Sequence, residues 1–140
     1  MKDVVRRGSA FNAVWNGGFQ LPAGGKTGTT NDYTDVWFIG YTTDLVAGAW
    51  MGFDQPKRIK ANAQGGQLAA PAWTAFMREV YARKPASPDW PRPAGILALD
   101  IDLRSGLLRG PGCGSDSTAI AYFLPGTEPT AECGRRGFFR

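Results

Sequence analysis

Five consecutive residues, Lys26-Thr27-Gly28-Thr29-Thr30, combine a cation, three hydroxyls and a residue without a side chain. On a strand, Thr27 and Thr29 project to the same face, because side chains alternate. Hydroxyls beside an ammonium group can bind a carboxylate, and an exposed strand edge can take an extended peptide. A glycine inside a strand usually marks close approach by a ligand or another backbone. The segment indicates a carboxylate-binding strand, although a glycine-rich turn with a surface lysine would use the same residue types.

Several other chemistries are excluded or disfavoured by composition. The chain contains no histidine, which removes every scheme with a histidine base and the ordinary histidine-based metal sites. A phosphate-binding P-loop is excluded, because Gln20 stands where the first glycine is needed and strands follow instead of a helix. The net charge of +4 is modest, and the basic clusters 57–60 and 135–140 are short. We therefore expect no metal, no cofactor and no nucleic-acid partner.

Two apolar runs after this segment are typical of strands. Residues 36–41 and 45–51 are rich in β-branched and aromatic side chains, and Thr42-Thr43-Asp44 is short enough for a hairpin. Together with the strand that carries Lys26, they predict three antiparallel strands in sequence order. Because both runs are apolar on both faces, we expect a sheet that is covered on both sides.

Two helices are also predicted. The opening residues 1–7 are typical of the end of a helix that stops at Gly8. Residues 65–83 show helical spacing, with Pro71 suited to the first turn and a basic C-terminal end. The apolar stripe of this second helix consists of Ala69, Ala72, Trp73, Phe76, Met77 and Val80. It should lie across one face of the sheet.

A proline-rich linker from Lys84 to Pro93 marks the best boundary in the chain. It predicts one portion over residues 1–84 and another over residues 85–140. In the second portion, residues 96–108 alternate like a half-buried hairpin that turns at Arg104-Ser105-Gly106, with Asp100 and Asp102 on the side opposite the leucines. The remainder is loop-like. Cys113 and Cys133 could form a disulfide worth roughly 3 kcal/mol, or remain free thiols in a cytosolic protein.

The segments around Lys-Thr-Gly support a family resemblance. Lys-Thr-Gly is a signature element of β-lactamases and penicillin-binding proteins. The chain resembles the class A, bifunctional penicillin-binding proteins of the 1A type over most of its length. The matching segments are residues 1–10, 23–53, 65–73 and 122–130. The resemblance implies part of an α/β fold of the α+β type, the penicillin-binding transpeptidase fold, with antiparallel strands and a C-terminal packing helix.

The resemblance also implies a reaction and roles for the strand residues. Such enzymes transfer the acyl group of a D-Ala-D-Ala stem peptide through a serine ester, and β-lactams acylate the same serine. Lys26 would stabilise negative charge, and Thr27 and Thr29 would hold the terminal carboxylate. The N–H of Thr29 would donate to the oxyanion, Gly28 would keep bulk away from the nucleophile, and Thr30 would complete the substrate-binding set. Export of such enzymes favours the disulfide Cys113–Cys133.

The nucleophile motifs of this family are absent from the chain. No serine begins Ser-x-x-Lys or Ser-x-Asn. We expect the N-terminal half of the domain, a glycosyltransferase and a membrane anchor upstream, with the parent at the periplasmic face of the bacterial inner membrane. The chain alone should be inactive and poorly soluble. Its expected partners are stem peptides, β-lactams and the missing N-terminal part. A non-catalytic wall-associated binding module, or a pseudogene remnant, is the alternative.

Overall fold

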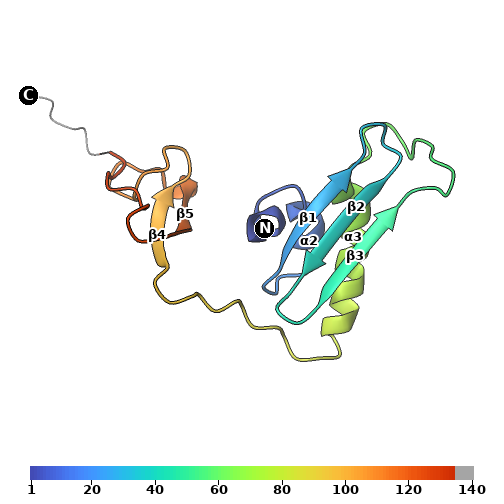
Figure 1. The fold of residues 1–140 in the computed structure, drawn as a ribbon, viewed down its shortest axis with the longest axis horizontal. Coiled ribbons are helices and arrows are strands. Elements are labelled where there is room, and N and C mark those ends of the chain that lie inside the picture. The colour runs from blue at the N-terminus through green and yellow to red at the C-terminus, as the bar shows by residue number, and fades with distance from the viewer. Residues whose placement is uncertain (135–140) are drawn as a thin grey trace, which may run out of the picture. The chain divides into compact units, whose positions relative to one another are not determined.

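The computed structural model describes residues 1–134, and the basic cluster at 135–140 lies outside the described residues. The chain forms two units, Met1–Trp90 and a second unit that begins at Pro91. In the first, β1 (Gly24–Thr29), β2 (Val36–Tyr41) and β3 (Val46–Met51) pair antiparallel in the order β1-β2-β3, as predicted (Figure 1). The register places Thr27 opposite Phe38 and Gly28 opposite Trp37. Thr27 therefore shares a sheet face with Phe38, and Lys26 lies on the other face with Trp37.

The long helix α3 (Gly65–Tyr81) lies across the face that carries Phe38 (Figure 1). Trp73 is its anchor: the ring meets Phe38 and Phe19 edge-on, and Nε1 donates to the Ala47 carbonyl oxygen at 3.1 Å. A Cβ at Gly40 would lie 2.6 Å from the Trp73 ring, so glycine there lets the indole rest on the strand. Helix and sheet share one core.

The predicted helix stripe was wrong in part. Ala69, Trp73 and Met77 are buried, but Ala72 is exposed and Phe76 is 53% exposed. Ala70 and Thr74 complete the buried face instead. A Cβ at Gly17 would lie 3.3 Å from Thr74 Cγ2, so this side of the helix packs on the segment before β1 and not on the sheet. Pro71 lies inside the helix and not in its first turn. Periodicity alone placed the helix but not the orientation of its buried face.

Only one face of the sheet is covered by the described residues. On the other face, Trp37, Ile39 and Trp50 are 44%, 49% and 44% exposed, so the described residues do not supply the second covering layer that the sequence predicts. Apolar side chains on both faces of a strand indicate two buried faces only when another layer is present. Because exposed apolar side chains favour association, the poor solubility of this chain alone stays a prediction.

Two short helices precede the sheet. The first, α1 (Lys2–Arg6), ends before Gly8 as predicted, where a Cβ would lie 2.8 Å from the Val4 Cα. The second, α2 (Phe11–Val14), is not among the predicted helices and lies in the glycine-rich segment 11–25. Val14 of α2 is buried in the core. Four residues are too few to show a helical period in the sequence, so tertiary packing holds this turn.

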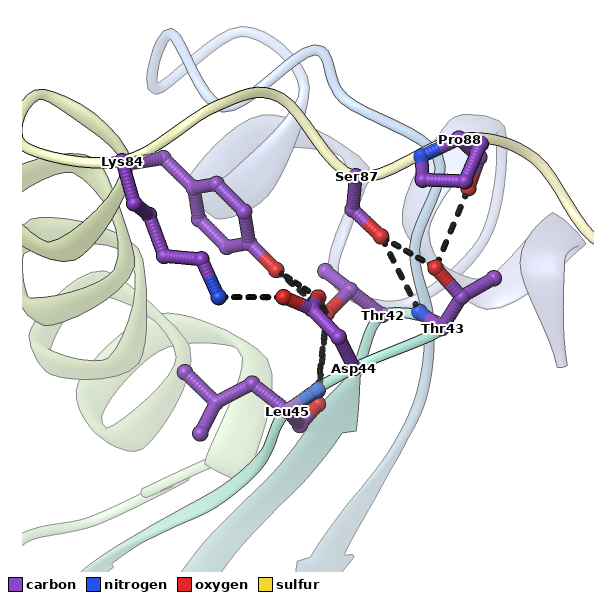
Figure 2. A network of polar contacts seen from close by, with 8 residues as sticks. Thr42, Thr43, Asp44, Leu45, Lys84, Ser87 and Pro88 are labelled. Carbon is purple, nitrogen blue, oxygen red and sulfur yellow. Dashed lines mark hydrogen bonds and ion pairs between the residues drawn. The ribbon is translucent and has the colours of Figure 1, made fainter.

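A polar network ties the β2–β3 turn to the C-terminal end of α3 (Figure 2). The Asp44 carboxylate accepts hydrogen bonds from Lys84, from the Tyr81 hydroxyl and from Thr42 Oγ1. Lys84, followed by the two hydroxyls, holds the pKa of Asp44 well below its usual range. Ser87 is buried and bonds Thr43 in the same turn. The network fixes the hairpin against the helix.

Residues 85–90, predicted to belong to the linker, contact the first unit. Asp89 forms an ion pair with Lys2, and the Trp90 ring meets Tyr41 with centroids 5.6 Å apart. The Lys2 ammonium also lies 5.0 Å from the centre of the Trp90 ring. These long-range contacts explain why the first unit extends to Trp90, beyond the composition boundary at Lys84.

The second unit is built on a pair of antiparallel strands, β4 (Leu97–Asp102) and β5 (Thr118–Phe123). The prediction of a hairpin over residues 96–108 was incomplete. The chain does turn after Asp102, and Ile101 forms an isolated bridge with Leu108, but the main partner of β4 is β5, in a segment predicted to be loop. Because β4 and β5 are far apart in the sequence, no local residue pattern predicts that they pair.

A buried carboxylate and a disulfide hold this unit together. Asp102, which the alternation placed on the exposed side, is 6% exposed and accepts hydrogen bonds from Ser117 Oγ, Ser105 N and Ser105 Oγ. The Ser117 hydroxyl, followed by Ser105, lowers the pKa of Asp102 to about 2. A disulfide joins Cys113 and Cys133, whose Cα atoms are 5.6 Å apart.

Candidate functional site

The candidate site lies on β1, at the edge of the three-stranded sheet. The Gly25 N–H donates to the Met1 carbonyl oxygen at 3.4 Å, away from β2, whereas the Thr30 N–H donates to Asp35 at 3.0 Å. Backbone groups alternate in direction along an antiparallel strand. The N–H and C=O groups of Thr27 and Thr29 therefore point to the outer edge, like those of Gly25. An extended peptide or an anion can reach them there.

The two threonine hydroxyls lie on the α3 face of β1, and each has a hydrogen-bond partner. Thr27 Oγ1 lies 3.0 Å from Ser9 Oγ. Thr29 Oγ1 accepts the N–H of Gly65 at 3.1 Å, which satisfies one of the free donors at the start of α3. The positive end of the α3 dipole is therefore next to Thr29, where it favours a bound anion.

Lys26 is exposed on the opposite face of the strand. Its Nζ turns toward the outer edge and donates to the Thr27 carbonyl oxygen at 2.7 Å. The Lys26 ammonium reaches the outer edge of β1 from one face of the strand, and the two threonine hydroxyls reach it from the other face. The three groups therefore share an edge but not a face. A ligand at this edge can meet all three groups.

Gly28 and Thr30 have different surroundings. A Cβ on Gly28 would meet only the Trp37 Cβ, at 3.3 Å, so contacts within the chain give only part of the reason for a glycine. Thr30 Oγ1 accepts the N–H groups of Thr34 and Asp35 at 3.1 and 3.0 Å. Thr30 closes the β1–β2 turn and thereby fixes the end of the strand.

The sequence interpretation missed two residues of this region, Ser9 and Gly65. A Cβ on Gly65 would lie 2.3 Å from the Trp37 carbonyl oxygen and 2.7 Å from that of Gly28, so only glycine allows the start of α3 to touch the strands. The pair Gly65-Gly66 opening a helix was a usable signal, because glycine disfavours helices and needs a compensating reason there. No sequence signal connected Ser9 with Thr27.

The described residues, 1–134, contain no group of three His, Cys, Asp or Glu side chains that could hold a metal ion. None of their helices combines the length and the apolar character required to cross a membrane.

Comparison with known proteins identifies the family. A family profile described as penicillin-binding protein 1A, C-terminal domain, matches residues 92–136. Penicillin-binding protein 1A of Pseudomonas aeruginosa is 39% identical over 123 residues, which cover 88% of this chain. The chain belongs to the penicillin-binding protein 1A family. The protein of the same name from Escherichia coli is 36% identical over 135 residues and 84% of this chain.

The structural comparison agrees with this family assignment. A crystal structure of penicillin-binding protein 1A from Haemophilus influenzae superimposes on 79% of the chain with a TM-score of 0.64 and 35% identity. The antiparallel, mixed helix and strand architecture is therefore a part of the transpeptidase fold, as predicted. The chain spans only 14% of the Pseudomonas relative and 16% of the Haemophilus chain. It corresponds to the C-terminal region of such proteins.

Proposed function

We propose that the β1 edge is the Lys-Thr-Gly side of a serine D,D-transpeptidase site that cross-links peptidoglycan stem peptides and is acylated by β-lactams. The observation that carries the proposal is the geometry of β1, whose edge presents the Lys26 ammonium, the Thr27 hydroxyl and the Thr29 N–H together. The parent protein would lie at the periplasmic face of the bacterial inner membrane and would also carry a glycosyltransferase.

In this proposal the reacting serine comes from a part of the protein outside this chain, because no serine here has the Ser-x-x-Lys spacing. The serine oxygen gives its proton to a base outside this chain and attacks the carbonyl carbon of the D-Ala-D-Ala bond, and the Thr29 N–H donates to the oxygen that becomes negative. The C–N bond then breaks, the terminal D-Ala leaves as a protonated amine, and an amine of a neighbouring stem peptide later takes the acyl group and releases the serine. Loss of one such donor typically costs roughly 3 kcal/mol of transition-state stabilisation. Thr27 and Thr29 hold the terminal carboxylate, and Lys26 adds positive charge.

Labelling with a fluorescent penicillin tests the proposal. The purified 140-residue chain should acquire no covalent label, whereas the full-length penicillin-binding protein that carries these residues should label stoichiometrically. Lys26→Ala in the full-length protein should suppress labelling, and Lys60→Ala, an exposed lysine outside the strands, should not. Labelling of the isolated chain would refute the need for an outside serine. Full labelling of the Lys26→Ala protein would refute the role of the β1 edge and would favour the binding-module alternative.

A further inference from the structure

Ser9 is the residue of the site region that neither the motif nor the proposed mechanism uses. Its hydroxyl lies 3.0 Å from the Thr27 hydroxyl, although 18 residues separate the two in the chain. The backbone of Ser9 also packs closely against Gly66, since a Cβ on Gly66 would lie 2.1 Å from the Ser9 carbonyl oxygen. The start of α3 therefore packs directly on the Ser9 backbone and fixes where its hydroxyl can reach.

The direction of this hydrogen bond decides what Thr27 can do. A hydroxyl carries one proton, and a carboxylate can only accept. If Thr27 is to donate to a carboxylate, it must accept from Ser9, and Ser9 must be the donor of the pair. Thr29 has the same arrangement, since its oxygen accepts the Gly65 N–H and its own proton remains available. With Ser9 as the donor, the oxygen of each threonine accepts one hydrogen bond from within the chain, and its own proton is available to a ligand.

We infer that Ser9 is a positioning residue for the carboxylate of the substrate or β-lactam, acting through Thr27. The inference rests on the proposed function and extends it by one residue. Ser9 does not touch the reacting atoms. It holds the Thr27 side chain in one orientation and donates to its oxygen, so that the Thr27 proton points to the bound carboxylate. Two hydrogen bonds in series also polarise one another.

The rate constant for acylation of the full-length protein tests this inference. It is measured with a penicillin and with the methyl ester of the same penicillin, which lacks the carboxylate. We expect Ser9→Ala to lower the rate with the free acid about fivefold, which corresponds to roughly 1 kcal/mol for one hydrogen bond, and to leave the ester rate unchanged. Ser9→Thr keeps the hydroxyl and should restore the acid-to-ester ratio. Ser87→Ala, which removes another serine bonded to a threonine, should not change that ratio.

A double-mutant cycle separates action through Thr27 from a general effect on folding. In a Thr27→Val background, Ser9→Ala should cause no further loss of the acid-to-ester ratio. Equal losses with acid and ester, or a full loss on top of Thr27→Val, would overturn the inference. If Thr27→Val itself leaves the ratio unchanged, the proposed carboxylate site fails and the inference fails with it. If Thr27→Val lowers the ratio but Ser9→Ala does not, only the role of Ser9 fails.

Discussion

Replacement of Gly65 by alanine should destabilise the contact between α3 and the strands. The added Cβ would lie 2.3 Å from the Trp37 carbonyl oxygen, 2.7 Å from the Gly28 carbonyl oxygen and 3.2 Å from the Gly28 nitrogen. These are backbone atoms of paired strands, which cannot rotate away as a side chain can. The start of the helix must therefore shift outward, and the Gly65 N–H moves away from Thr29 Oγ1.

Three terms determine the magnitude, one stabilising and two destabilising. Alanine favours a helix over glycine by about 1 kcal/mol. Overpacking costs about 1–3 kcal/mol, and because the start of the helix can shift outward we take about 2 kcal/mol for these backbone contacts. The lost hydrogen bond to Thr29 adds about 1 kcal/mol of destabilisation. We expect a net loss of about 2 kcal/mol, which corresponds to a roughly 30-fold rise in the opening equilibrium.

Amide hydrogen exchange read by mass spectrometry can measure this loss on the full-length protein that carries these residues. Peptides from β1 and from the first turns of α3 should exchange roughly 30-fold faster in Gly65→Ala. Gly48→Ala is the matched control in the same sheet, because its Cβ would meet only Ile39 Cγ1 at an ordinary 3.8 Å. Exchange in Gly65→Ala as slow as in the unsubstituted chain would refute the reasoning, since helix propensity would then outweigh the contact.

Two further predictions concern the second unit. Replacing Cys113 and Cys133 by serine opens a loop with a sequence separation of 20, which should lower the stability of the second unit by about 3 kcal/mol. Amides of β4 and β5 should then exchange roughly 100-fold faster, while exchange of α3 amides stays unchanged. An equal change in α3 would contradict a local effect. The second prediction concerns acid. Asp102 has a pKa of about 2 in the folded unit against 3.8 ordinarily, so the unfolded chain binds more protons between these values. The Asp102 contribution is present above about pH 4 and is lost as the pH falls toward 2. Protection of β4 should fall over that window, and Asp102→Asn should abolish this pH dependence.

The sequence by itself determined those elements whose signals are local. The strands at 36–41 and 46–51 carry β-branched and aromatic side chains, and the helix that begins at Gly65 carries a long helical period. The alternation of side chains also placed Thr27 and Thr29 on one face, as the pairing register shows. The Lys-Thr-Gly segment, together with the matching strands, helix start and C-terminal stretch, was sufficient for the family, because all of these are segments of local sequence.

The tertiary structure decided what depends on residues distant in the chain. Asp102 is buried because Ser105 and Ser117 satisfy its carboxylate, although alternation alone placed it outside. The pairing of β4 with β5, and the orientation of α3 on the sheet, follow from packing between separated segments. The same holds for the site. The sequence supplied its ammonium and its hydroxyls, but the contact of Ser9 with Thr27 exists only because α3 packs on the segment before β1.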